Sequence, residues 1–101
     1  MRQLADDLDV FARRHGLRRG VEAAAVLKTA RQVCRDILPT ELAEQARPAS
    51  FRLGTLFIEA PTGAALALLA SYRETISKKI SDKIGPGLVR RVIVRAATIE
   101  N

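Results

Sequence analysis

Positively charged side chains are concentrated in the last third of this sequence, and they favour contact with a polyanion over a chemical reaction. Residues 71–95 contain seven Lys and Arg residues against two carboxylates, Glu74 and Asp82, which gives this segment a net charge of +5. Each cation that neutralises a backbone phosphate releases about one counterion, so a cluster of cations binds phosphates well. The alternative is a solvated surface that keeps the domain soluble. The candidate phosphate-binding residues are Arg73, Lys78, Lys79, Lys83, Arg90, Arg91 and Arg95.

Catalytic and metal-dependent chemistry has few candidate residues. The sequence contains one cysteine, Cys34, and one histidine, His15, so we expect neither an intramolecular disulfide nor a transition-metal cluster. A Ser–His–Asp or Cys–His arrangement would depend on His15, which lies in a run of arginines. We therefore expect no catalytic residue, no metal, no cofactor and no enzymatic activity, and we expect Cys34 to be inert packing.

Length and composition indicate one folded domain. A chain of 101 residues has room for one modest core, and 48% hydrophobic residues with few Gly and Pro argue against disorder. The longest apolar stretch, Gly63 to Ala70, is much shorter than the ~20 residues of a membrane-spanning helix. We expect a single domain over residues 1–101, with its core at about 4–97, in the cytoplasm and without a membrane partner.

Apolar residues at spacings of three and four predict three helices. The first runs from Leu4 to His15, and the second carries an apolar stripe from Val26 to Ile37. Pro39 either ends the second helix or begins a short continuation through Thr40 to Gln45. The third helix is a single long one that begins after the cap residue Thr62.

Alternation of apolar and polar residues predicts three strands. Ser50 to Leu53 and Thr55 to Ala60 form a hairpin in which the two strands are separated by a glycine. The final run, Leu88 to Ala97, is rich in β-branched residues and presents arginines on one face. The expected fold is α+β in the order α-α-β-β-α-β, with the helices packed on one face of a three-stranded sheet.

The other face of this sheet is expected to stay partly open. Phe57 and Ile93 lie on it, with Arg91 and Arg95 nearby. Nucleic-acid bases stack on aromatic rings and guanidinium groups, so Phe57 and Ile93 form a possible stacking surface. The same two residues are equally suited to contact with a protein partner or a second copy of the chain.

The middle of the chain, from Cys34 to Ala60, combines Arg47-Pro48-Ala-Ser with Gly54-Thr-Leu-Phe-Ile-Glu. A helix that ends in Ile80-Ser-Asp-Lys-Ile-Gly85-Pro-Gly-Leu-Val and a basic strand follow. In this order and spacing, residues 4–96 resemble the DciA family of bacterial replicative-helicase loaders. The sequence resembles a divergent member, because Cys34 and Ala65 occupy the places where the family typically has tryptophans.

This resemblance implies a KH-like fold that binds nucleic acid and engages a DnaB-type replicative helicase. The leading hypothesis is an accessory protein of DNA replication that binds single- or double-stranded DNA mainly through phosphates. Two alternatives stay open: a protein-interaction module or homodimer that uses the open sheet face, and an RNA-binding KH-like module.

Gly85-Pro86-Gly87 invites comparison with the Gly-x-x-Gly loop by which KH domains clamp a nucleotide backbone. The spacing is one residue too short for that loop. A helix C-cap explains both glycines, so we interpret the segment as the end of the third helix.

Overall fold

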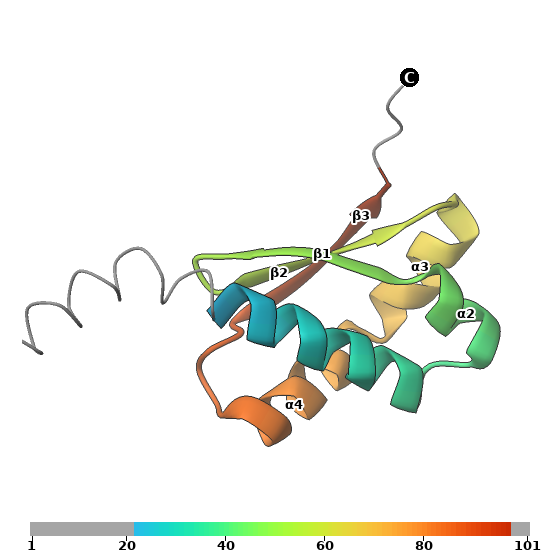
Figure 1. Cartoon of the computed structure of the whole chain (residues 1–101). Helices are drawn as coiled ribbons and strands as arrows, with labels where there is room; N and C mark the ends of the chain where they lie inside the picture. The colour runs from blue at the N-terminus through green and yellow to red at the C-terminus, as the bar shows by residue number, and fades with distance from the viewer. Residues whose placement is uncertain (1–21, 98–101) are drawn as a thin grey trace, which may run out of the picture.

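The structure, a computed structural model, describes residues 22–97. The described helices and strands are the helix of residues 22–37, α2 (Thr40–Gln45), β1 (Arg47–Arg52), β2 (Thr55–Ala60), α3 (Gly63–Ser71), α4 (Arg73–Ile84) and β3 (Arg91–Ala96) (Figure 1). This combination of helices and a three-stranded sheet confirms the predicted α+β, KH-like class. The helix expected from Leu4 to His15 lies outside the described residues.

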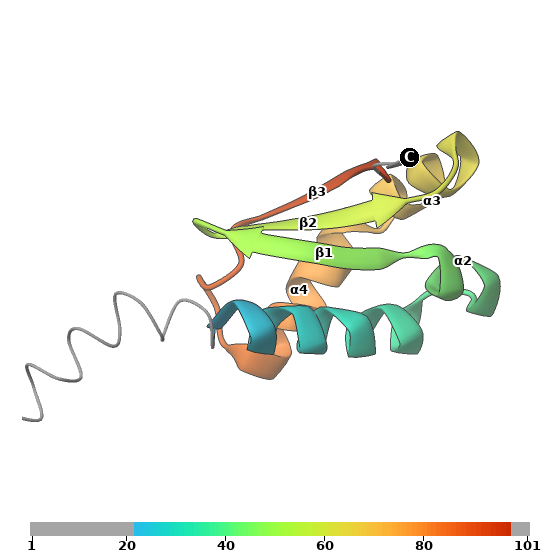
Figure 2. The same ribbon diagram turned by 45° about the horizontal axis from the view of Figure 1, so that its top comes forward.

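The strand β2 is the centre of the sheet, whose order is β1-β2-β3. It pairs antiparallel with β1 and parallel with β3. A parallel pair needs a crossover connection, and α3 and α4 provide it. The 22–37 helix and α4 lie on the same side of the sheet (Figure 2). Within residues 22–97 the opposite face carries no helix, as the sequence predicted.

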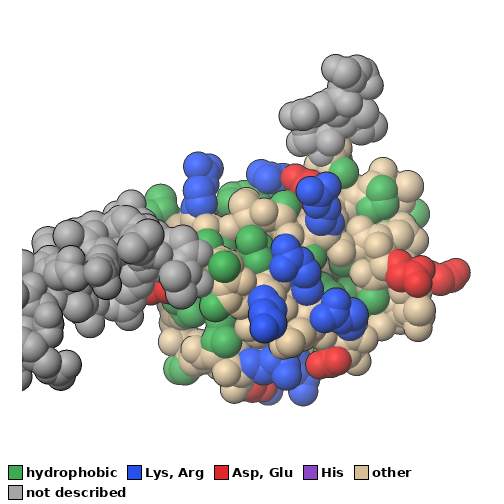
Figure 3. Space-filling model, in the orientation of Figure 1, with side chains coloured by type: hydrophobic (Ala, Val, Ile, Leu, Met, Phe, Trp, Pro, Cys, Tyr) green, Lys and Arg blue, Asp and Glu red, His purple; other side chains and the backbone are tan. Residues whose placement is uncertain are grey.

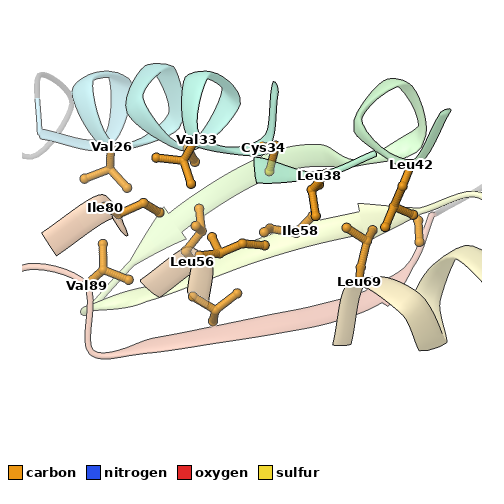
Figure 4. Packing of buried hydrophobic residues seen from close by; sticks show 14 of the residues in the cluster. Val26, Val33, Cys34, Leu38, Leu42, Leu56, Ile58, Leu69, Ile80 and Val89 are labelled. Carbon is orange, nitrogen blue, oxygen red and sulfur yellow. The ribbon is translucent and has the colours of Figure 1, made fainter. Parts of the chain in front are cut away.

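Alternate side chains of β2 form the centre of the hydrophobic core. Leu56 and Ile58 are completely buried, and so are Ile76 and Ile80 of α4. Figure 4 shows Val26 of the 22–37 helix and residues of the sheet and α4 pointing into one shared interior. Burial of each large aliphatic side chain contributes about 1.5–3 kcal/mol relative to its exposed state. The core therefore determines which face of each strand points outward.

The β1–β2 hairpin turns through two residues, Leu53 and Gly54, with φ angles of 51° and 81°. Positive φ at both central positions is the geometry of a type I′ turn, whose twist matches that of the strands. The carbonyl oxygen of Gly54 accepts hydrogen bonds from the backbone N–H groups of Arg90 (2.7 Å) and Arg91 (3.1 Å). These two bonds fix the start of β3 against the hairpin.

The strand β1 begins at Arg47, three residues earlier than the alternation predicted. Its register with β2 shifts between Pro48 and Ser50, which marks a β-bulge. A bulge adds one residue and changes the parity of the alternation, and Pro48 removes a backbone donor. For these reasons the first half of β1 does not look like a strand in the sequence.

The predicted long third helix is wrong in one respect, because it is two helices that meet at Tyr72. Side chains on both sides of the break bond to carbonyls in the last turn of α3: the Ser71 hydroxyl donates to the Leu68 oxygen (2.6 Å), and Arg73 Nε donates to the Ala70 oxygen (3.1 Å). Such local side-chain bonds compete with helix continuation. The apolar stripe runs across the break without interruption, so spacing alone does not reveal it.

Of the two alternatives for Pro39, the structure shows the second, a short helix from Thr40 to Gln45. Helical structure stops at residue 37, and Pro39 is the N-cap of the short α2. Its carbonyl oxygen accepts the N–H of Ala43 at 2.8 Å, which is the first bond of the new helix. Proline fits this position because it has no N–H and the first turn of a helix needs none.

Candidate nucleic-acid interface

The open face of the sheet is a small grid of nine side chains. Directly paired residues of neighbouring strands point to the same side, so the register defines three rows across the sheet. The rows are Arg52–Thr55–Arg91, Ser50–Phe57–Ile93 and Arg47–Glu59–Arg95. The two outer rows thus contain four arginines, and the middle row contains the aromatic ring. We call these nine residues the open sheet face.

The charge of the open sheet face is strongly positive. Four arginines and one carboxylate, Glu59, give it a net charge of +3. Glu59 forms an ion pair with Arg95, in which Nη2 lies 3.4 Å from Oε2. The Arg95 side chain is 45% exposed and that of Glu59 only 12%, so the arginine remains in contact with solvent. The other three arginines are exposed and have no carboxylate partner among the described residues.

Arg95 also lies over the ring of Phe57, with its Cζ 4.5 Å from the ring centroid. A guanidinium group at this distance is attracted to the negative face of the ring. Phe57 and Ile93 are half-buried and adjacent, as the sequence predicted for this face. A planar cation therefore already occupies the position that a planar ligand would take.

The seven predicted phosphate-binding residues do not share one surface. Arg91 and Arg95 lie on the open sheet face, whereas Lys78, Lys79 and Lys83 project from α4, which packs against the other face of the sheet. The separation follows from alternation in β3: Val92 is buried on the side toward α4, so its neighbour Arg91 points away from that helix.

The lysines of α4 also differ from one another. Lys78 lies four residues from both Glu74 and Asp82, so carboxylates flank it on the same side of the helix. Lys79 and Lys83 share a different side of α4, and both are exposed.

The last two predicted cations have local structural roles. Arg73 caps α3 through its bond to the Ala70 oxygen, although it is exposed. The side chain of Arg90 packs against the hairpin turn: a Cβ placed on Gly54 would lie 3.3 Å from its Cγ and Nε.

Two arginines of the open sheet face, Arg47 and Arg52, were not predicted as site residues. The bulge between Pro48 and Ser50 hid the face of Arg47, whereas Arg52 lies after the bulge, in regular alternation with Ser50, and that alternation was the available signal. Sequence analysis also did not select the exposed cations of the 22–37 helix, which are Lys28, Arg31 and Arg35. Figure 3 shows that Lys and Arg side chains outnumber Asp and Glu on the side of the molecule where this helix lies in front. These three cations are spaced by three and four residues on the polar side of an amphipathic helix. Such a pattern is common to many soluble helices, so it does not by itself indicate a binding site.

The glycine segment after α4 is a helix end, as predicted. Gly85 is the C-cap with a φ of 107°, and its N–H donates to the Ser81 oxygen at 2.8 Å. Gly87 also has a positive φ, of 86°, a conformation that side chains other than glycine rarely adopt.

No metal-binding group of three or more His, Cys, Asp or Glu residues occurs among residues 22–97. Burial raises the pKa of the Cys34 thiol to about 11, with a smaller opposing influence from Arg35. The thiol therefore stays protonated at neutral pH, and the thiolate is the nucleophilic form. No helix in the described part of the chain is long and apolar enough to cross a membrane.

Fold and surface together define a KH-like α+β domain with a basic open sheet face. The sequence profile of one family, described as Dna[CI] antecedent, DciA, matches residues 4–94. This chain belongs to the DciA family, which implies a role in DNA replication as a loader of the DnaB-type helicase. A comparison with curated proteins gives no match to an individual protein.

Proposed function

We propose that this DciA-family protein binds DNA mainly through phosphates while it serves the replicative helicase, and that the open sheet face is the principal contact. The observation that carries the proposal is the set of four arginines around one carboxylate, on a face that no helix of residues 22–97 covers (Figure 2). Guanidinium groups bind phosphate oxygens well because their N–H donors match phosphate geometry. Lys79 and Lys83 on α4 are a second candidate contact, on the opposite layer.

The salt dependence of binding tests this proposal. If three to four arginines each neutralise one phosphate, the log–log slope of affinity against salt is about −2.7 to −3.6 on duplex DNA and about −2.1 to −2.8 on single strands. Fluorescence anisotropy of labelled oligonucleotides over a salt series measures this slope. An affinity that does not change with salt would refute phosphate binding.

Two double variants with the same net charge locate the contact. Arg52→Glu with Arg91→Glu changes the open sheet face, and Lys79→Glu with Lys83→Glu changes α4, and each pair lowers the formal charge of the chain from +6 to +2. We expect the sheet variant to lose most of its DNA affinity and the α4 variant to lose less. Equal losses would mean that net charge, and not the open sheet face, determines binding.

A partner of a different class is the alternative for the same face, because Phe57 and Ile93 place apolar surface at its centre. A protein partner predicts that Ile93→Asp abolishes co-sedimentation with a DnaB-type helicase while DNA affinity is retained. An RNA partner predicts tighter binding to oligo(U) than to oligo(dT). Either result would replace DNA as the ligand of this surface.

A further inference from the structure

Phe57 is the one aromatic side chain on the open sheet face, and phosphate binding gives it no role. Building on the proposed function, we propose that this face binds single-stranded DNA, with one base stacked on Phe57 in the position that the Arg95 guanidinium occupies in the free protein. The four arginines then hold the phosphates on either side of that base. The proposal adds selectivity for single strands to the electrostatic contact.

The position of Phe57 allows such stacking. It lies on the central strand and in the middle row, and its neighbours along β2 on this face are Thr55 and Glu59. Beside it, Ser50 on one strand is small, and Ile93 on the other extends the apolar surface. The guanidinium of Arg95, 4.5 Å from the ring centroid, shows that a planar group fits over the ring.

The guanidinium that covers Phe57 is weakly held and can be displaced. Its contact with Glu59 is 3.4 Å long, compared with about 2.7–2.9 Å for a strong charge-assisted hydrogen bond. The side chain is also 45% exposed, so water competes for it. A base that stacks on Phe57 would release Arg95, and a neighbouring phosphate is a stronger partner for a free guanidinium than one long contact to a carboxylate.

The arginines are spaced to hold a strand on both sides of the stacked base. Arg91 and Arg95 are four residues apart on β3, which corresponds to about 13 Å along the strand. Phe57 and Ile93 lie between the two rows that contain these arginines. A backbone that crosses the face would meet positive charge before and after the aromatic ring.

A site that binds by base stacking distinguishes single strands from duplexes. In a duplex the bases are stacked on one another and are not available to a side chain, whereas a single strand exposes them. With one aromatic ring on the described face, the contact accepts any base, since every base has a π-face. We therefore expect selectivity for strandedness and little selectivity for sequence.

The chain has no tryptophan, so a Phe57→Trp variant carries a single reporter of stacking. We expect oligo(dT) to quench its fluorescence, and an abasic oligonucleotide of the same length, with the same phosphates and no bases, to bind without quenching. Phe51→Trp is the matched control, because Phe51 pairs with Leu56 on the core side of the sheet and is not accessible to a base on the open face.

Affinity measurements complete the test. Phe57→Leu keeps an apolar side chain and removes the ring, and we expect it to weaken oligo(dT) binding by roughly 5- to 150-fold. Its affinity for the abasic oligonucleotide should stay that of the parent protein. Phe57→Tyr retains a ring and should retain affinity for oligo(dT).

The outcomes separate this inference from the proposed function. If oligo(dT), duplex and abasic DNA all fail to bind at low salt, phosphate binding itself is wrong, and the stacking proposal falls with it. If all three bind with a steep salt slope but Phe57→Leu changes none of the affinities, phosphate binding stands and stacking is refuted. Quenching of Phe51→Trp equal to that of Phe57→Trp would also refute stacking on the open face.

Discussion

Replacing Glu59 by Gln should strengthen DNA binding, because Glu59 is the one carboxylate on the open sheet face. It holds Arg95 at 3.4 Å and neutralises one of the four arginine charges. Without it, the net charge of the face rises from +3 to +4, and Arg95 is free to meet a phosphate. Glutamine has nearly the same shape, so the packing of the face should be preserved.

The magnitude follows from counterion release. On duplex DNA no base stacks on Phe57 and Arg95 stays paired with Glu59, so three phosphate contacts give a log–log salt slope of about −2.7, and a fourth contact makes it about −3.6. The substitution should therefore steepen the slope on duplex DNA by about 0.9 and raise the affinity at low salt. Loss of a half-exposed ion pair should cost less than about 1 kcal/mol of folding stability.

Anisotropy titrations of a labelled duplex over a salt series measure both the slope and the affinity. Glu74→Gln is the matched control, because it removes the same charge from α4 on the opposite side of the sheet. An identical change of slope in the Glu74→Gln protein would show that total charge controls affinity, and the reasoning about the open sheet face would then be wrong. An unchanged slope of Glu59→Gln on duplex DNA would show that Arg95, once released, makes no phosphate contact.

Three further predictions concern stability. Burial raises the pKa of the Cys34 thiol from 9.0 to about 11 in the folded protein, so the unfolded chain loses this proton at lower pH than the folded one. The contribution of the protonated thiol to the free energy of unfolding is therefore fully present below pH 9 and is lost as the pH rises toward 11. Urea titrations should show a loss of at most about 3 kcal/mol over this range, and a Cys34→Ala protein that loses just as much would contradict the assignment. Ile58→Ala should lower the free energy of unfolding by about 2–5 kcal/mol, because the Ile58 side chain is completely buried. Ile93→Ala should lower it clearly less, because Ile93 lies half-buried on the open sheet face. Equal losses of stability in thermal melts would mean that the open sheet face is packed as tightly as the core. Leu53 is 95% exposed and has a φ of 51°, a conformation that asparagine adopts more readily than leucine. Leu53→Asn should therefore raise the free energy of unfolding by about 0.5–1 kcal/mol, measured by urea titration. A lower free energy of unfolding would show that the leucine makes stabilising contacts of its own.

The faces of the central and last strands could be predicted from the sequence because their alternation is regular, although the last strand begins at Arg91 and not at the predicted Leu88. Leu56 and Ile58 alternate with Thr55, Phe57 and Glu59, and the structure buries Leu56 and Ile58 and leaves the other three on the open face. Helix and strand periods are imposed by backbone geometry, so a regular run is sufficient to assign the face of each residue. The side on which Arg91 and Arg95 lie was predictable for this reason.

What could not be predicted depends on interactions that have no period. The bulge between Pro48 and Ser50 reverses the parity of β1, so the contribution of Arg47 to the open face appears only with the pairing register. The break at Tyr72 depends on the hydroxyl of Ser71, which bonds to a carbonyl three residues earlier. The placement of Lys79 opposite Arg91 depends on the way α4 folds back against the sheet, and composition carries no information about that layer.

The separation of core and surface within β2 and β3 also explains why the proposed binding variants should fold. In both strands, alternate residues belong to two different sets: one set packs against the helices, and the other forms the open sheet face. A substitution at Arg91 or Phe57 therefore removes no large buried side chain, and the hydrophobic interior that holds the three strands together is preserved.

The converse also holds, since a change at Ile58 weakens the fold without changing the charge or the ring that a nucleic acid would meet. Because the two sets alternate residue by residue, stability and DNA binding in this sheet should be separable by substitutions at adjacent positions, and a pair such as Phe57→Leu and Ile58→Ala tests that separation within a single strand.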